Sequence, residues 1–384
     1  MRVVDSHSMI YPSSSCEIIP LHLPPLQEDN AGDCSGPLPS PNLTLRNDRG
    51  FVSAHLVVYL ILAVIAALVL PTYIRIRTSK AYDQEEYQVA IRKPGDHILG
   101  DPVCLCKEGT EDLPFALLSL AAYQKKSDVG QNPTADGDLI SMGWAKWPDS
   151  TDEEFLRKIR KVHLRVEVWS HEVDKKVAVT FGGTVFTNRA DWRANLRWFI
   201  PTDNDEYSVV AKAFAKYFVK AFPVQTPGWD STTISLYSTG HSLGGGLAQQ
   251  FAYALPYDSE TPLKNVPRVK KVYAFDPSPV TGYYSVQRRL RRHNSKGLYI
   301  DRIYERREIL AYLRSIMNFI HPPSADNPSI RQLRYNLFPT RNPLAGHSIS
   351  DFASCLATQL KHIAARNAGG PTVAPQTTQP ITSL

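Results

Sequence analysis

The residues Gly240-His241-Ser242-Leu243-Gly244 fit the pattern GxSxG, in which a serine can act as a nucleophile. That chemistry needs a strand before the serine, a helix after it and small residues in the sharp turn between them, so that the hydroxyl emerges at the edge of a sheet. The preceding segment "TISLYS" has the composition of a strand. Apolar residues then recur at helical spacing: Leu243, Leu247, Ala248, Phe251 and Leu255. The context favours a nucleophilic Ser242 over a plain glycine-rich turn.

A serine hydroxyl is a weak nucleophile near neutral pH, so it needs a histidine base and an acid that orients the histidine. Four histidines follow Ser242 in the chain: His293, His321, His347 and His362. His347 is the best candidate, because "LAGHSISDF" puts it in a loop just before an amphipathic segment. The alternative is an ordinary surface-loop histidine.

The elements around these residues alternate between strand-like and helix-like patterns from about residue 81 to 366. "VAVTF" (177–181) is continuously apolar, as a central strand covered on both faces would be. "VKKVYAF" (269–275) and "LYIDRIY" (298–304) also read as strands, while residues 207–222 have helical spacing. The last predicted helix carries five apolar residues on one face: Ile349, Phe352, Leu356, Leu360 and Ile363. This alternation predicts an α/β fold, with a mostly parallel sheet flanked by helices.

The two ends of the chain have different compositions from this region. Residues 1–50 contain seven prolines and no clear apolar periodicity, which predicts a disordered tail, and residues 367–384 form a charge-free tail. Residues 51–70, "FVSAHLVVYLILAVIAALVL", are long and apolar enough to predict one transmembrane helix before the α/β domain. The expected localisation is therefore a single-pass membrane protein. The basic residues that flank segment 51–70 are nearly balanced in number. They favour a cytoplasmic C-terminal domain only slightly, so the orientation stays open.

Composition excludes several classes of function. The net charge of +6 is compatible with approach to anionic lipid and falls far short of a nucleic-acid binder. The five cysteines are scattered, and the Cys104-Leu-Cys106 pair has no second Cys or His pair at a ligand spacing. We therefore expect free thiols, no metal site and no cofactor. Protein partners are not indicated.

Taken together, these motifs resemble the class 3 lipase family, the fungal triacylglycerol lipase-like branch of the α/β-hydrolases. The resemblance covers about residues 110–365 and includes "VAVTFGGTVFTNRADW", "TGHSLGGGLAQ", "IYERREIL" and "GHSISDF", in the family's order. Gly182 stands where that family usually has an arginine. The resemblance implies a serine hydrolase that acts on lipid esters at a membrane surface.

The resemblance also implies the acid and one oxyanion donor. The acid position is Glu308, where the family has an aspartate, and Asp276, at the end of an earlier strand, is the alternative. The backbone N–H of Leu243, next to the nucleophile, is one expected oxyanion donor by geometry, and Thr184 is the second by the family match.

Residues 185–200 occupy the place of the family's mobile lid and offer Trp192, Leu196, Trp198 and Phe199 as an apolar face for substrate. The alternative is that these side chains belong to the core. The run "RRLRRHNSKG" (288–297) has the charge to hold anionic head groups, although such a run is more often a solvated face.

The leading hypothesis from the sequence is a membrane-anchored serine hydrolase, a triacylglycerol lipase or phospholipase, with Ser242, His347 and Glu308 as its triad. One alternative keeps the chemistry and changes the substrate to a soluble ester or thioester. Another is a catalytically silent membrane scaffold with a lipase fold, which the altered acid and the missing arginine suggest.

Overall fold

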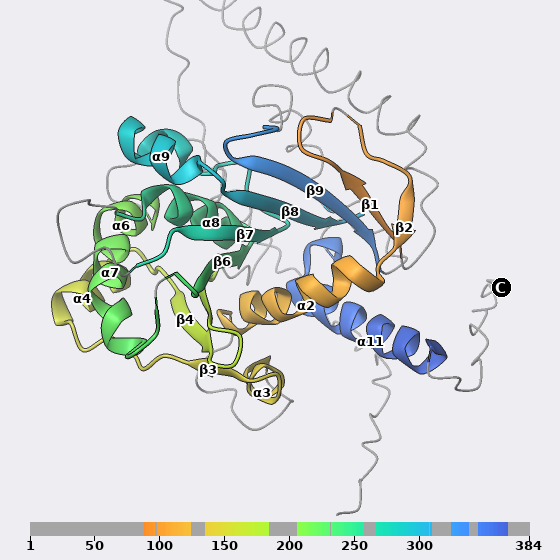
Figure 1. Cartoon of the computed structure of the whole chain (residues 1–384), viewed down its shortest axis with the longest axis horizontal. Coiled ribbons are helices and arrows are strands. Elements are labelled where there is room, and N and C mark those ends of the chain that lie inside the picture. Colours follow the sequence, from red (N-terminus) through yellow and green to blue (C-terminus); the bar gives the residue numbers. More distant parts are fainter. Residues whose placement is uncertain are drawn as a thin grey trace, which may run out of the picture. The chain divides into compact units, whose positions relative to one another are not determined.

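The computed structural model describes residues 88–96, 98–123, 135–183, 206–230, 232–256, 266–306, 308, 324–337 and 345–367. Within these residues the strands form one sheet, in the order β2-β1-β9-β8-β7-β6-β5-β4-β3. Figure 1 shows this twisted sheet with helices packed around it.

The centre of the sheet is parallel. Its five strands are β5 (Lys176–Phe181), β6 (Ser235–His241), β7 (Val269–Phe275), β8 (Tyr299–Glu305) and β9 (Ser329–Asn336). Each pairs in parallel with the next. Their carboxyl ends therefore meet at one edge, which is where open α/β sheets carry their sites.

Antiparallel strands flank this centre on both sides. On one side lie β1 (Gln88–Arg92) and β2 (Pro102–Cys104), and on the other β4 (Val166–His171) and β3 (Trp144–Lys146). The mostly parallel sheet predicted from the sequence is confirmed, with antiparallel pairs only towards its edges.

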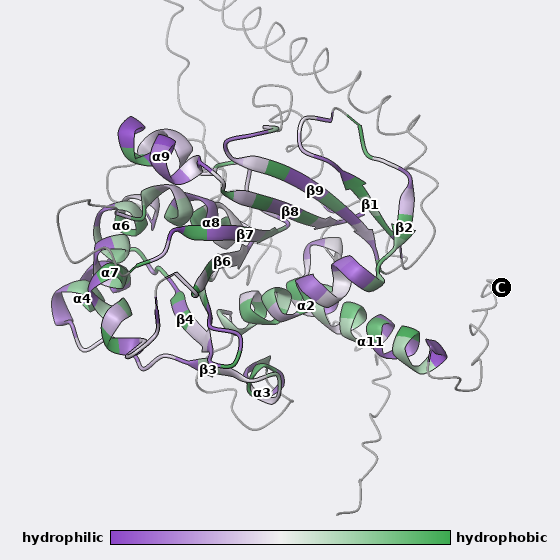
Figure 2. Cartoon of the chain, viewed as in Figure 1, coloured by the Kyte–Doolittle hydropathy of each residue, from purple (hydrophilic) through white to green (hydrophobic). Residues whose placement is uncertain are grey.

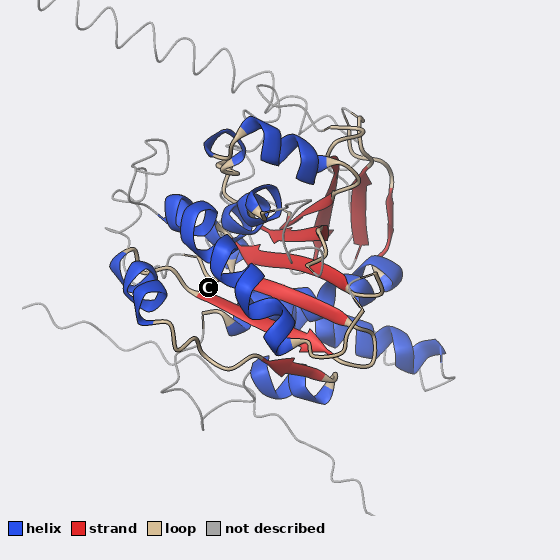
Figure 3. Cartoon of the chain, turned by 60° about the vertical axis from the view of Figure 1, so that its left-hand side comes forward, coloured by secondary structure: helices blue, strands red, loops and turns tan. Residues whose placement is uncertain are grey.

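Helices cover both faces of the sheet, as Figure 3 shows from a second direction. One face carries α4 (Glu153–Lys161), α6 (Glu206–Val209), α7 (Ala215–Gln225), α8 (Leu243–Ala254) and α9 (Arg288–Ser295). The other face carries α2 (Cys106–Ala121), α3 (Ala135–Ser141) and α11 (Ile349–Asn367). A π-helical stretch, η4 (Val210–Phe214), joins α6 to α7 within the segment predicted as one helix. Short 3-10 turns occupy η6 (Tyr283–Ser285) and η7 (Ala345–His347).

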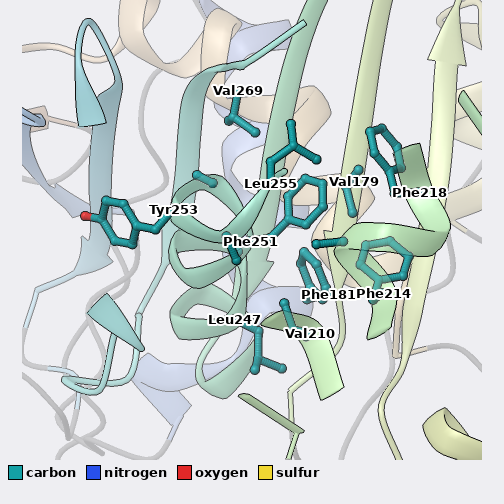
Figure 4. Packing of buried hydrophobic residues seen from close by; sticks show 14 of the residues in the cluster. Val179, Phe181, Val210, Phe214, Phe218, Leu247, Phe251, Tyr253, Leu255 and Val269 are labelled. Carbon is teal, nitrogen blue, oxygen red and sulfur yellow. The ribbon is translucent and has the colours of Figure 1, made fainter. Parts of the chain in front are cut away.

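Alternation along the strands divides the core into two layers, because successive side chains point to opposite faces. In β7, Val272 packs with the α8 layer and Tyr273 with the α2 layer. The α8 layer is rich in aromatic rings. Figure 4 shows Phe251 of α8 among Phe181, Phe214 and Phe218, with ring centroids between 5.3 and 5.7 Å from that of Phe251.

Glycines let α8 lie directly against the central strands. A Cβ at Gly244 would collide with the carbonyl oxygen of Phe181, and a Cβ at Gly240 would collide with the backbone of Gly244. The close approach that the sequence motif predicts for this helix therefore depends on missing side chains at these two positions. It fixes the direction in which α8 leaves the sheet edge.

The membrane localisation predicted from the sequence is corrected by this structure. Along the described ranges, no helix has both the length and the apolar composition needed to cross a bilayer. A span needs about 20 predominantly apolar residues, whereas α11 has 19 residues and alternates hydrophobic with hydrophilic positions (Figure 2). The predicted transmembrane segment 51–70 and both predicted tails lie outside the described residues, except for Asn367, which ends α11.

A second difference concerns the cysteines. Cys104 and Cys106 form a disulfide, with their sulfur atoms 2.10 Å apart, instead of the free thiols expected. Cys355 is a free thiol on α11. The scattered spacing of the cysteines indicated no disulfide framework, and a bridge across a single residue follows from local backbone geometry that composition does not reveal.

Candidate active site

Ser242 lies in the turn between β6 and α8, at the carboxyl edge of the sheet. Its backbone has φ 57° and ψ −122°, a conformation that residues with a side chain rarely adopt and that costs about 1–3 kcal/mol. The turn is held from two sides: the Ser242 N–H donates to Phe275 O at 2.9 Å, and Ser242 O accepts from Ser278 N at 2.9 Å and Gly245 N at 3.0 Å. The strained turn predicted for GxSxG is therefore present.

His347 faces the serine hydroxyl. Its Nε2 is 3.1 Å from Ser242 Oγ, and both side chains are buried. His347 ends the short turn η7 and immediately precedes α11, whose apolar face packs Ile349, Phe352 and Leu356 into the core. The helix therefore anchors the loop that carries the imidazole, 105 residues away from Ser242 in the sequence.

Glu308 lies on the other side of the imidazole ring. Its Oε2 is 3.2 Å from His347 Nδ1, and the residue is fully buried. With Ser242 Oγ–H donating to Nε2, the histidine carries its proton on Nδ1 and donates it to Glu308. One hydrogen-bond chain thus runs from the serine through the histidine to the carboxylate, which is the geometry that a catalytic triad requires.

Asp276, the alternative acid, lies under the same site with a different set of contacts. It follows β7 with φ 39°, and its Oδ1 accepts from Glu305 N at 3.3 Å. Its Oδ2 is 3.9 Å from His241 Nε2. Asp276 thus contacts Glu305 N and His241, whereas Glu308 is hydrogen-bonded to His347 Nδ1.

The buried His241 and the half-buried Tyr123 form a layer next to the hydrogen-bond chain of Ser242, His347 and Glu308. The ring of His241 lies 4.7 Å from that of His347, centroid to centroid, and His241 Nδ1 is 3.1 Å from Tyr123 Oη. Tyr123 Oη also lies 3.2 Å from the carbonyl oxygen of His241 and is hydrogen-bonded to the backbone of Gly183. Burial raises the pKa of Tyr123 above its ordinary value, so the phenol stays protonated.

Gly183 connects this layer to the expected oxyanion loop. A Cβ there would collide with Tyr123 Oη and would come within 2.7 Å of the His241 carbonyl oxygen, so only glycine fits. The Leu243 N–H lies in the first turn of α8, where amide groups have no partner within the helix. Thr184 and the four lid candidates, Trp192, Leu196, Trp198 and Phe199, lie outside the described residues.

His241, Asp276 and His347 also form a group with metal-ligand chemistry. One potential ligand atom from each lies within 4.8 Å of the others, and all three are buried. However, His347 directs its two nitrogens at Ser242 and Glu308, and His241 directs Nδ1 at Tyr123. A metal ion would have to break the hydrogen bonds that align the serine. The arrangement therefore suits proton transfer better than metal binding.

The functional layer that sequence reasoning missed consists of Tyr123 and the side chain of His241. Tyr123 ends the segment after α2, 118 residues before His241, and no motif connects the two. His241 stands inside the GxSxG motif itself. Its position next to the serine is the one feature of the sequence that could have indicated a role for its side chain.

The chain was compared with protein families, curated proteins and solved structures, and only the solved structures gave matches. No protein-family model matches the chain, and no curated protein matches it.

A fungal lipase solved as an inhibitor complex is similar over 58% of this chain and 77% of its own, with 17% identity and a TM-score of 0.39. The Rhizomucor miehei triacylglyceride lipase matches over 61% and 78%, with 18% identity and a TM-score of 0.36. A Yarrowia lipolytica lipase matches over 54% and 74%, with 15% identity and a TM-score of 0.34.

Proposed function

We propose that this protein is a serine hydrolase that cleaves carboxylic esters through a covalent acyl-enzyme. The proposal rests on one observation, the hydrogen-bond chain Ser242 Oγ–His347 Nε2 and His347 Nδ1–Glu308 Oε2, with distances of 3.1 and 3.2 Å. The strained backbone of Ser242 supports it, because such strain at a buried turn is retained where it orients a reacting group.

The reaction follows from these contacts. His347 takes the proton of Ser242 as Oγ attacks the ester carbonyl, and the Glu308 carboxylate stabilises the imidazolium. The Leu243 N–H, with a donor from Thr184, stabilises the oxyanion. His347 then gives its proton to the departing alcohol. Water, activated in turn by His347, releases the acid and restores the serine.

The substrate class that we propose is a lipid ester, a triacylglycerol or a phospholipid. It follows from the family resemblance of the motifs and from the aromatic residues expected in the lid segment. The resemblance leaves open which ester bond is cleaved, so the chemistry and the substrate need separate tests.

Covalent labelling tests the chemistry. A fluorophosphonate probe should label the protein at Ser242, and Ser242→Ala should abolish labelling while the circular dichroism spectrum stays unchanged. Ser278→Ala serves as the matched control, because Ser278 contacts the same turn only through its backbone amide. A protein that does not label would support the catalytically silent scaffold, and equal labelling of Ser242→Ala would rule out Ser242 as the nucleophile of a serine hydrolase.

Chromatography of the products tests the substrate. The protein is incubated with mixed triacylglycerols, phospholipids and short soluble esters, and Ser242→Ala is the blank. Release of fatty acid from either lipid class supports the proposal. Turnover confined to short soluble esters or thioesters would keep the serine hydrolase and remove the lipid substrate.

A further inference from the structure

Helix α9 carries most of the basic run, and its cationic side chains gather on one surface. Four basic side chains of the helix and Lys296 just after it line a single hollow of about 570 Å³, which we call the α9 hollow; the four are Arg288, Arg289, Arg292 and His293. Figure 2 shows α9 as a strongly hydrophilic helix. Every lining side chain in the described part of the chain is basic.

The α9 hollow lies at the end of the sheet opposite Ser242. Helix α8 begins at the serine and runs 12 residues away from it, which corresponds to about 18 Å. At the far end, Asn294 Nδ2 donates to Tyr253 O at 2.9 Å and Leu255 O at 2.7 Å. Arg268, just before β7, donates to His293 O and Lys296 O. These contacts fix α9 at the amino edge of the parallel strands.

The arrangement of charge is unfavourable for the helix itself. Arg288 and Arg292 are four residues apart on α9, where like charges repel on a helix surface. Arg288 and Arg289 also stand in the first turn, next to the positive end of the helix dipole, and no acidic residue is present in that turn. A bound anion would relieve both conflicts.

Other cations nearby have structural partners, and the contrast is informative. Arg291 stacks on the ring of Tyr283 at 4.6 Å and donates to its carbonyl oxygen at 3.2 Å. Arg268 closes the end of α9 as described above. Among the described residues, Arg288, Arg289 and Arg292 form no ion pair with a carboxylate, whereas other arginines such as Arg160 and Arg331 do. Their charges therefore serve no contact of the fold in this part of the chain.

We propose that the α9 hollow binds a soluble anion that carries two or more phosphate groups. Guanidinium groups bind phosphate oxygens in pairs, and the volume falls in the range of small-molecule sites, about 300–1,000 Å³. A nucleic acid fits poorly, because a helix of eight residues spans only about 12 Å. A membrane also fits poorly, because a lipid surface that reaches Ser242 would contact the opposite edge of the sheet. The choice of a soluble anion over a membrane rests on the proposed function. Binding of a phosphate anion is measured without hydrolysis, so the two proposals can fail separately.

Calorimetric titration of the whole protein with inorganic triphosphate, at constant ionic strength, tests this site. We expect Arg288→Gln/Arg292→Gln to weaken binding about tenfold or more, since charge-assisted contacts to two phosphates are lost. The matched control is Arg157→Gln/Lys161→Gln, which removes the same charge from exposed positions on α4. This control should change the affinity less than about twofold, the residual effect that distant surface charge exerts through screened electrostatics.

Folding and competing ligands are measured in the same experiment. The α9 double variant should be at least as heat-stable as the wild type without ligand, because it removes repulsion; if it fails to fold, Arg292→Gln alone replaces it. Absence of triphosphate binding, equal loss in the α4 control, or equally tight binding of orthophosphate would overturn the proposal. Binding to phosphatidylserine vesicles that outcompetes triphosphate and depends on Arg288 and Arg292 would assign the hollow to a membrane instead.

Discussion

Single residues determine the geometry of the candidate active site, and Ser242 is the clearest case. Its positive φ keeps the hydroxyl at the tip of the turn, and four backbone hydrogen bonds hold the strained peptide in place. Replacement by alanine removes the Oγ and keeps the Cβ, so the turn should survive. Chemistry and fold are therefore separable at this position.

Glu308 and Asp276 make the sharpest test at the residue scale. We expect Glu308→Gln to lower kcat by about 10⁴-fold, the loss that follows an acid-to-amide change in a serine protease, because the amide neither stabilises the imidazolium nor fixes its tautomer. Asp276→Asn should cost far less, since Asp276 contacts Glu305 N and His241. Steady-state hydrolysis of a short ester by both folded variants measures this. A crippled Asp276→Asn beside a near-normal Glu308→Gln would assign the acid to Asp276.

Tyr123 is expected to act through the oxyanion loop. Tyr123→Phe removes the hydroxyl that joins Gly183, the His241 carbonyl and His241 Nδ1, and these hydrogen bonds are lost. We expect kcat to fall about tenfold with KM nearly unchanged, in line with a loss of roughly 1–3 kcal/mol. Tyr284→Phe, on an exposed tyrosine, is the control. A change in KM alone would contradict a role in the oxyanion loop.

The sequence predicts the proposed triad residues Ser242, His347 and Glu308, but it does not predict the neighbouring layer of Tyr123 and His241. Ser242 and His347 are recognisable because each stands in a local pattern next to an amphipathic helix, and Glu308 is recognisable from its segment. Tyr123 belongs to no pattern, because its function arises from contact with a loop 60 residues away in the chain. Such contacts depend on how strands are ordered in the sheet, which spacing along the chain does not encode.

At the scale of elements, α8 connects the site to the core, and Phe251 is its central contact. We expect Phe251→Ala to lower the free energy of unfolding by about 3–5 kcal/mol, because three neighbouring rings would border the cavity. Denaturant unfolding measures the change. Val224→Ala, at a side chain that is 72% exposed on α7, should change stability by less than about 0.5 kcal/mol. Equal effects would mean that the α8 layer is loosely packed.

A buried carboxyl on α2 predicts a specific dependence of stability on pH. Asp112 is fully buried and accepts a hydrogen bond from Tyr335 Oη at 2.7 Å, and burial together with the charge of Asp301 raises its pKa well above the ordinary value. Above about pH 4 the unfolded chain therefore releases a proton that the folded protein retains, so stability falls as pH rises towards the folded pKa.

Asp112→Asn removes this titration and should flatten the profile. The stability of the variant relative to the wild type is expected to increase with pH above about 4, by up to about 1.4 kcal/mol per unit, until the folded pKa is passed. Denaturant unfolding at several pH values measures the difference. Asp138→Asn, at an exposed position on α3, should run parallel to the wild type. A parallel profile for Asp112→Asn would mean that Asp112 is ionised in the folded protein.

Sequence patterns predicted the elements whose buried positions are apolar residues. β5 is an almost continuous apolar run, β7 ends in the apolar run Val272–Phe275 after two lysines, and both strands lie where they were predicted. β9 escaped notice because it buries polar side chains, among them Gln332, Arg334 and Asn336. Next to them, Arg331 forms two hydrogen bonds with Asp301 on β8, at 2.8 and 2.6 Å. Polar residues become suitable for a central strand only through such partners, which sequence periodicity does not show.

At the scale of the whole molecule, the described residues of both hydrophobic layers lie between Val89 and Ile363. We therefore expect a polypeptide of residues 81–366 to unfold in a single cooperative transition and to label with fluorophosphonate at the rate of the full chain. Scanning calorimetry and labelling kinetics measure the two properties. A polypeptide that aggregates while the full chain stays folded would show that residues outside 81–366 complete the core.

The pairing of β1 with β9 has a consequence for synthesis on the ribosome. Gln88 pairs with Asn336, 248 residues later in the chain. At about 5–20 residues per second, β1 waits roughly 10–50 s for its partner, and the β2–β1 hairpin has little stability of its own meanwhile. Until Ser329–Asn336 emerges, the edge of β8 that faces β9 is an open template for other nascent strands. Slow decoding shortly before β9 should therefore favour aggregation over folding, even though the encoded protein is unchanged.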